Sequence, residues 1–191
     1  MEGKRKVAVV VGSLRQGSFS RMAAKAMCGL APSLDCDIVE IGKLPLYDQD
    51  LEERGAPAEW TEFRRRIKAA DAILFVTPEY NRSMSGALKN AIDVGSRPYG
   101  QAAWWGKPAA VVSLSQGALG GFGANHHVRQ CLVFLDMPVM QSPEAYVGNA
   151  AKLFDAQGNL ASAETREFLC GFMAKFAAWI ETTAPGLRNA A

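Results

Sequence analysis

Cysteine, histidine and long apolar runs are all scarce in this chain. Its 191 residues include four cysteines and two histidines, and no two cysteines stand in a C-x-x-C pair. We therefore expect neither a disulfide framework nor a cysteine-based zinc site, and the cysteine usage favours a reducing, cytoplasmic compartment. No apolar run reaches the roughly 20 residues that cross a bilayer, and no signal peptide is recognised, so membrane insertion is not expected.

An excess of charge of one sign is also absent. The chain carries 21 basic and 19 acidic residues, which gives a net charge of +2. This balance argues against nucleic acid or an anionic membrane as a partner. The adjacent His126 and His127 point to different sides of a helix and lack the i, i+4 spacing of a two-ligand pair, so no metal is expected. The length fits a single domain over residues 1–191.

Apolar runs alternate with helical patterns along the chain, which is typical of a parallel sheet covered by helices on both faces. We expect strands at 6–12, 36–41, 72–76 and 108–114, with a short fifth strand that begins at 138–140 and resumes near Tyr146. Helices are expected at 20–31, 58–69, 87–94, 125–135 and 161–182, and a surface loop at 43–57.

The loop after the first expected strand is rich in glycine and hydroxyl groups, and it reads GSLRQGSFS over residues 12–20. It leads directly into a helix, where free backbone N–H groups and the helix dipole favour an anion. Ser13, Ser18 and Ser20 add hydroxyl donors, and Arg15 adds a positive charge. This pattern favours a phosphate-bearing ligand.

Other interpretations of the same loop stay open at this point. An ATP-type phosphate loop ends in Gly-Lys-Ser/Thr, which is missing. The dinucleotide fingerprint needs three glycines, and this loop offers only Gly12 and Gly17. An ordinary strand-to-helix turn with Ser20 as the helix N-cap would need no ligand.

Two further loops follow strands of the same expected sheet. Residues 77–86 offer Pro78, Tyr80 and exposed backbone beside Asn81, and residues 115–123 are very rich in glycine. In a doubly wound sheet such loops meet at the carboxyl edge, where ligands bind. Glycine backbone can approach a flat ring closely. The three loops together favour a phosphorylated planar heterocycle, which FMN fits best and adenine nucleotides fit less well.

Three motifs carry a resemblance to the NADPH-dependent FMN reductase family, and within it to bacterial quinone and chromate reductases. They are SLRQGSFS at 13–20, PEYNRS at 78–83 and GALKNAID at 86–93. The resemblance extends from Val7 to the C-terminal helix. It implies an α/β, flavodoxin-like three-layer sandwich with a five-stranded parallel sheet in the order 2-1-3-4-5.

The resemblance also implies which residues bind FMN. The phosphate would be held by Ser13, Arg15, Ser18 and Ser20. The ring would be bordered by Pro78, Glu79, Tyr80, Asn81 and Ser83. Its pyrimidine side would lie near Ser115, Gly117 and Gly120.

The activity expected from this resemblance is NAD(P)H-dependent reduction of quinones and other small acceptors, including chromate. FMN carries the chemistry in ping-pong fashion, so no catalytic side chain and no metal is expected. A homo-oligomer, dimer or tetramer, is expected. The alternatives are a flavodoxin-type electron carrier, whose usual acidic docking face the net charge disfavours, and a regulatory nucleotide-binding module without flavin.

Arg82 departs from the family pattern, because many relatives carry tyrosine there. It is expected to pair with the NADPH phosphate, with an anionic oxidant such as chromate, or with Glu144 of a neighbouring subunit; a solvated surface charge is the alternative.

Trp104 and Trp105 form a second unusual feature. At least one is expected at an interface or over the pocket, although ordinary packing stays open.

Overall fold

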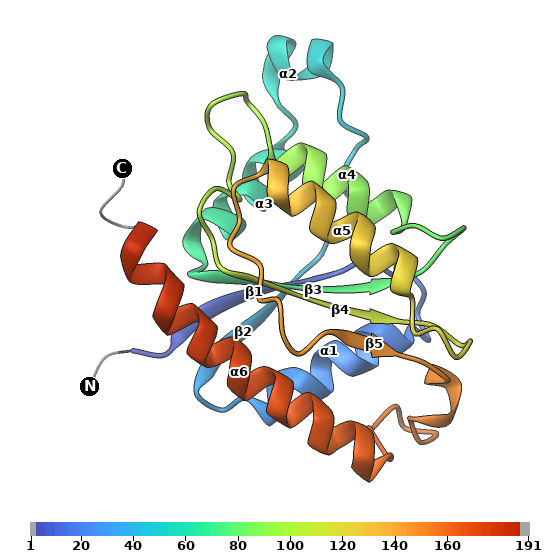
Figure 1. Cartoon of the computed structure of the whole chain (residues 1–191). Coiled ribbons are helices and arrows are strands. Elements are labelled where there is room, and N and C mark those ends of the chain that lie inside the picture. The colour runs from blue at the N-terminus through green and yellow to red at the C-terminus, as the bar shows by residue number, and fades with distance from the viewer. Residues whose placement is uncertain (1–2, 188–191) are drawn as a thin grey trace.

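Five parallel strands form the centre of the molecule in the order β2-β1-β3-β4-β5, which confirms the expected topology (Figure 1). The structure, a computed structural model, describes residues 3–187, with side chains to residue 183. The strands are β1 (Arg5–Val11), β2 (Leu34–Val39), β3 (Ala72–Pro78), β4 (Ala109–Leu114) and β5 (Ala145–Val147).

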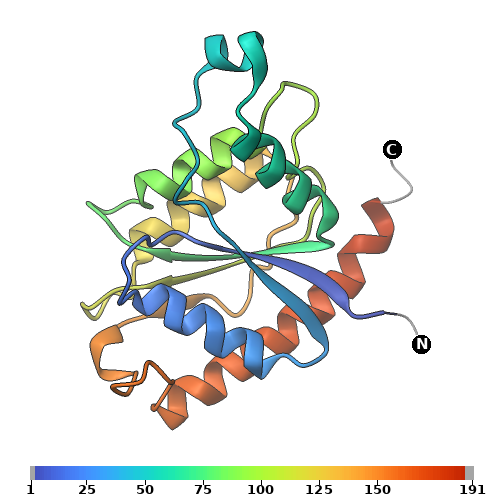
Figure 2. The same ribbon diagram turned by 180° about the vertical axis from the view of Figure 1, so that it is seen from behind.

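Helices cover both faces of this sheet and enclose two separate cores. Figures 1 and 2 show α1 (Phe19–Leu30) and α6 (Ala163–Leu187) on one face, with α3 (Ala58–Ala69), α4 (Gly86–Gly95) and α5 (Phe122–Phe134) on the other. Successive side chains of a strand point to opposite faces. In β1, Val9 therefore packs in the core under α1 and α6, whereas Val10 packs in the core under α3, α4 and α5.

Two segments of the chain differ from the sequence-based expectation. Residues 43–57 are not a plain loop, because they contain the helix α2 (Gln49–Gly55), which has no buried residue and therefore no apolar stripe to reveal it. Its start is a capping signal, since the Asp48 carboxylate accepts the Asp50 N–H at 2.8 Å. The fifth strand begins at Ala145 rather than at 138, because Val139 makes only one isolated bridge, to Ala109.

Helix α3 spans the expected residues 58–69, whereas the starts of α1, α4, α5 and α6 differ from expectation by one to three residues. The α1 cap is Ser18, whose side chain accepts the Arg21 N–H at 3.2 Å, so the interpretation with Ser20 as N-cap is wrong. Helix α5 begins at Phe122, three residues early, behind a left-handed Gly121. Helix α6 begins at Ala163 and extends past 182 to Leu187. The strand ends and helix starts nevertheless bring the three predicted loops to one edge of the sheet, on the right in Figure 1.

Candidate functional site

A pocket at the carboxyl edge of the sheet brings together residues of all three loops. We call it the edge pocket. Eight predicted site residues line it: Ser13, Arg15, Ser18, Ser20, Pro78, Glu79, Tyr80 and Ser115. Four lining residues were missed from the sequence: Phe19, Leu114, Gln116 and Ala150. The last of these belongs to the short helix η1 (Ala150–Lys152), whose place beside the loops had no local signal.

The end of the edge pocket formed by residues 12–20, called the phosphate end after the ligand expected there, has donors without acceptors. Ser13 and Ser20 are 4% and 3% exposed, and within the described part of the chain their hydroxyls form no hydrogen bond. The Ser18 hydroxyl accepts the Arg21 N–H, which leaves its own hydrogen free to donate. Arg15 is exposed and forms no ion pair among residues 3–183. Among the described residues only Arg129 Nη2 is a buried side-chain polar atom without a partner, so these hydroxyls are open to solvent, and with Arg15 they fit a bound phosphate.

Backbone contacts hold the β1 loop against β3 and α4. The Gly12 N–H donates to the Val76 carbonyl at 2.9 Å, and the Ser85 hydroxyl donates to the Gly12 carbonyl. A Cβ on Gly12 would lie 3.1 Å from Pro78 Cδ and 3.2 Å from a Leu88 methyl group. The glycine therefore allows a close approach that fixes the start of the phosphate loop.

The loop after β3 makes a tight turn. Tyr80 and Ser83 exchange two backbone hydrogen bonds of 2.9 Å each, and Asn81 and Arg82 between them adopt positive φ values of 51° and 63°. Such values match a two-residue hairpin turn. Tyr80 lines the edge pocket and is 46% exposed. Asn81, Arg82 and Ser83 do not line it, so their contact with a ring stays a prediction.

The Glu79 carboxylate is turned toward α5. Its side chain is 12% exposed, and its Oε2 accepts the Ala124 N–H in the first turn of that helix at 3.1 Å. Arg82 Nη1 lies 3.4 Å from Glu79 Oε1. Glu79 thus joins the loop after β3 to the first turn of α5.

The loop after β4 is packed against β5 and η1. The Ser115 N–H donates to the Val147 carbonyl at 3.1 Å, and the Ser115 hydroxyl donates to the Gly117 carbonyl at 2.9 Å. Gly120 has φ +61°, and a Cβ there would lie 2.4 Å from the Tyr146 carbonyl carbon. Neither Gly117 nor Gly120 lines the edge pocket. Gly120 therefore has a packing role, and the ring contacts of both glycines stay predictions.

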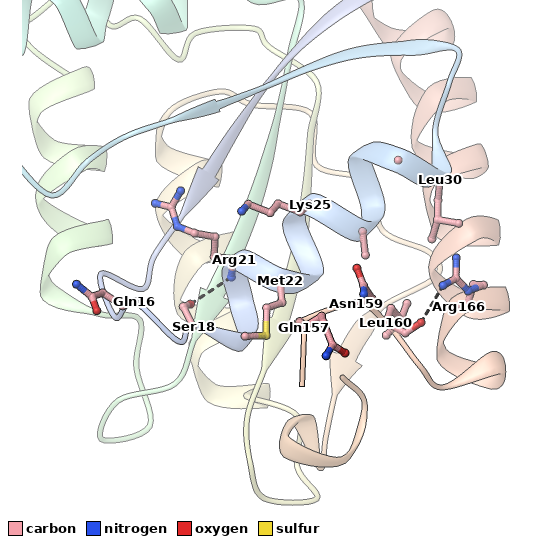
Figure 3. Close-up of a pocket in the computed structure, with 13 residues that line it drawn as sticks. Gln16, Ser18, Arg21, Met22, Lys25, Leu30, Gln157, Asn159, Leu160 and Arg166 are labelled. Carbon is pink, nitrogen blue, oxygen red and sulfur yellow. Dashed lines mark hydrogen bonds between the residues drawn. The ribbon is translucent and has the colours of Figure 1, made fainter. Parts of the chain in front are cut away.

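A second hollow, the α1 groove, lies on the outer side of α1, against residues 157–160 and the start of α6 (Figure 3). Its volume is about 560 Å³, larger than the roughly 110 Å³ of the edge pocket. The two share Ser18, whose cap to Arg21 is drawn in Figure 3, and in the groove Arg166 donates to the Leu160 carbonyl at 2.8 Å. The larger volume of the α1 groove does not make it the functional site, because no residue of the loops at 77–86 and 115–123 lines it.

The two histidines of α5 each form one side-chain hydrogen bond within the described residues. His126 Nε2 lies 3.0 Å from the Tyr146 hydroxyl, and His127 Nδ1 lies 2.9 Å from the Ser83 hydroxyl. Burial of Tyr146 and its contact with Glu144 raise the pKa of Tyr146 to about 12, so the phenol stays protonated near neutrality. Residues 3–183 contain no cluster of three or more His, Cys, Asp and Glu side chains that would hold a metal.

The two tryptophans behave differently. Trp104 is fully buried, donates its indole N–H to the Ile92 carbonyl at 3.0 Å and contacts the Phe63 ring, so ordinary packing explains it. Trp105 is 54% exposed.

Comparison with known proteins decides the family. The family described as NADPH-dependent FMN reductase matches residues 5–152. The chain belongs to the NADPH-dependent FMN reductase family. A quinone reductase of Pseudomonas putida is 64% identical over 176 residues, which cover 92% of this chain and 94% of that protein. A 2-hydroxy-1,4-benzoquinone reductase of Burkholderia sp is 48% identical, covering 92% and 96% of the two chains.

A solved relative supports the same assignment for this FMN reductase family member. FerB of Paracoccus denitrificans, a flavoenzyme NAD(P)H:(acceptor) oxidoreductase, superposes with a TM-score of 0.88 at 41% identity, covering 94% of this chain and 98% of that one. The fold is therefore flavodoxin-like, the cofactor is FMN and the electron donor is NAD(P)H. None of the helices in residues 3–187 has the length and apolar character needed to span a membrane.

Proposed function

We propose that this protein transfers electrons from NAD(P)H through FMN to quinones. The observation that carries the proposal is the edge pocket, where unpaired hydroxyl donors meet the loops after β3 and β4. Relatives at 64% and 48% identity that are named for quinone reduction support the acceptor class. Other small acceptors, including chromate, belong to the same proposal.

The residues of the edge pocket bind and orient the cofactor. Ser13, Ser18 and Ser20 donate hydrogen bonds to the phosphate, and Arg15 balances its charge. The chemistry that bound FMN would supply is transfer of a hydride from the nicotinamide and of electrons to the acceptor. Ser115 and Gln116 bring the backbone of the β4 loop to the other side of the pocket. No side chain is assigned as a nucleophile or as a general acid.

A ping-pong order is part of the proposal. The nicotinamide and the quinone would use the same exposed face of the FMN ring, so the oxidised donor would leave before the acceptor binds. Parallel lines in double-reciprocal plots at several quinone concentrations would support this order, and intersecting lines would contradict it.

We propose that Arg82 selects anionic substrates. Its side chain is 74% exposed, and its only ion pair within residues 3–183 is the 3.4 Å contact with Glu79. Its guanidinium is thus available for the NADPH 2′-phosphate, for chromate, or for Glu144 of a second copy. Replacing Arg82 by Ala should raise KM for NADPH or chromate about tenfold or more while KM for an uncharged quinone stays the same, because a charged hydrogen bond contributes about 1.5–3 kcal/mol. Unchanged kinetics and assembly would identify a solvated surface charge.

A homo-oligomer, dimer or tetramer, is part of the proposal. Several large apolar side chains lie on the surface, among them Tyr99 at 88%, Phe134 at 78%, Val133 at 77% and Trp105 at 54% exposure. Exposed aromatic side chains are typical of the centre of protein interfaces. Sedimentation equilibrium at micromolar concentration should give the mass of two or four chains, and a single-chain mass would contradict this.

A cytoplasmic location is also part of the proposal. All four cysteines are free, which fits a reducing compartment.

The deciding experiment is an anaerobic visible spectrum of the purified protein. The flavin bands near ~450 nm should bleach on addition of NADPH and return on addition of 1,4-benzoquinone. A yellow protein that NADPH does not bleach would indicate a flavodoxin-type carrier. A colourless protein that also fails to bind added FMN would contradict the assignment of the edge pocket.

A further inference from the structure

We propose that Glu79 is a positioning residue, which fastens the loop after β3 to the N-terminus of α5 and thereby fixes the side of the pocket that faces the FMN ring. The inference rests on the assignment of the edge pocket to FMN. Glu79 lines this pocket, but its carboxylate is bonded to α5. We therefore infer that it acts on the ring through the loop that it holds.

Helix α5 has no capping side chain of its own. Its N-cap is Gly121 in the left-handed conformation, which forms no side-chain cap hydrogen bond. The first N–H groups of a helix need acceptors, and a carboxylate there also interacts favourably with the helix dipole. Glu79 Oε2 supplies that acceptor to Ala124 from another loop, 45 residues away in sequence. The helix cap and the anchor of the β3 loop are thus one contact.

Gly123 shows how closely the loop and the helix approach each other. A Cβ at this position would lie 2.6 Å from the Arg82 carbonyl oxygen and 3.1 Å from Glu79 Oε2. Backbone atoms at such a distance must shift. The absence of a side chain at Gly123 is therefore required for the Glu79 contact to form.

A second bond joins the same two elements one helical turn farther along. His127 Nδ1 lies 2.9 Å from the Ser83 hydroxyl, on the other side of the turn from Glu79. The turn is thus held at both ends, by Glu79 before it and by Ser83 after it. Tyr80, which lines the edge pocket, lies between these two anchors.

The contact predicts different results for two substitutions of Glu79. Glutamine keeps an acceptor oxygen for the Ala124 N–H, whereas alanine removes it. We expect Glu79→Ala to raise the Kd for FMN about tenfold, as the loss of a charge-assisted hydrogen bond implies, and Glu79→Gln to raise it less than about threefold. Gly123→Ala should resemble Glu79→Ala. Gly29→Ala in α1 is the matched control, because a Cβ there meets no atom within 4 Å, and its Kd should not change.

The experiment measures two properties of FMN added to the apoprotein: its Kd by fluorescence quenching, and the visible circular dichroism of the bound ring at saturation. Glu79→Ala and Gly123→Ala should weaken binding and alter the ring dichroism, and Glu79→Gln should restore both. Arg15→Ala, at the phosphate end, should weaken binding and leave the dichroism unchanged. If the Glu79 contact were merely structural, Glu79→Ala would lower the melting temperature of the apoprotein. The FMN bound to that variant would then show the same ring dichroism as FMN bound to Arg15→Ala.

Several results would overturn the inference. Glu79→Ala with a normal Kd and normal dichroism would do so while the proposed function stands. Glu79→Gln as weak as Glu79→Ala would show that the hydrogen bond is not the cause. Should Glu79→Ala fail to fold, Glu79→Gln and Gly123→Ala still test the contact. Wild-type protein that binds no FMN would overturn the pocket assignment and this inference together.

Discussion

The two ends of the edge pocket are built in different ways. The phosphate end comes from one continuous segment, residues 12–20, in which the Ser18 side chain caps the helix that follows it directly. The ring end comes from segments after β3, β4 and β5, and there Glu79 caps a helix 45 residues away. A locally built site is visible in the sequence together with its contacts, whereas an assembled site shows its loops as motifs but not the contacts between them. The two ends should also respond differently to substitution.

The largest contrast is expected between two glycines. Gly120→Ala at the ring end should lower the free energy of unfolding by roughly 3 kcal/mol, because φ is +61° and the new Cβ would overlap the Tyr146 carbonyl. Gly17→Ala at the phosphate end should change it by less than about 0.5 kcal/mol, because no atom lies within 4 Å. Urea unfolding of the two apoproteins measures both values. Equal losses of unfolding free energy in the two variants would contradict the difference between the two ends of the pocket.

A smaller effect, on binding rather than on folding, is expected from Arg15→Ala. The substitution removes the charge-assisted hydrogen bond proposed between Arg15 and the phosphate, so the Kd for FMN should rise about 30-fold, or roughly 2 kcal/mol. The folding stability of the apoprotein should stay the same, because Arg15 is exposed. Lys25→Ala is a suitable control on the same side of the sheet. Protein that purifies with its full content of flavin would contradict the assigned role.

Asn90 belongs to the motif at 86–93 but does not line the edge pocket. Its side-chain oxygen accepts the Tyr47 N–H at 2.9 Å, and its amide donates to the Pro45 carbonyl at 3.0 Å. Asn90→Ala should cost about 1–2 kcal/mol of folding stability, since the partners of a removed group lose their bonds. The Kd for FMN should not change. A large loss of FMN affinity at normal stability would assign Asn90 to the cofactor instead.

The smallest effect is expected at the ion pair between Arg21 and Glu40, beside the phosphate loop. The Arg21 guanidinium lowers the pKa of Glu40 from its ordinary value of 4.5. A lowered carboxyl pKa gives stability above the ordinary pKa, and this stability is lost as the pH falls through the folded-state pKa. Because Glu40 is 62% exposed, Glu40→Gln should cost less than about 1 kcal/mol at pH 7. Chemical unfolding at pH 7 and in acid should show the difference shrinking toward zero; a constant difference would contradict the ion-pair explanation.

The sequence predicted the sheet and much of the phosphate end. A run of buried, mostly β-branched residues such as 7–11 is stable as a strand of a sheet that helices cover on both faces. The order of the strands followed from the family resemblance. The elements that it missed lack such a signal. Helix α2 buries no residue, and Ala150 enters the edge pocket only because β5 pairs with β4.

The motif at 78–83 shows where sequence reasoning stopped. The motif identified the loop, and Pro78, Glu79 and Tyr80 do line the edge pocket. It did not show that the Glu79 carboxylate points to Ala124, or that Ser83 faces His127. Those partners lie more than 40 residues away, so their approach depends on how β3, β4 and α5 pack.

By itself, the sequence determined the alternation of strands and helices, the hydroxyl-rich loop at 12–20 and the family. These follow from hydrophobic periodicity and from groups that lie within one turn of each other. Only the tertiary structure decided how the loops of the ring end contact one another, the role of Glu79 as the cap of α5, and the requirement for glycine at 120 and 123. The physical reason is that backbone N–H groups and close backbone contacts carry no side-chain pattern, so their partners are defined only when distant segments pack together.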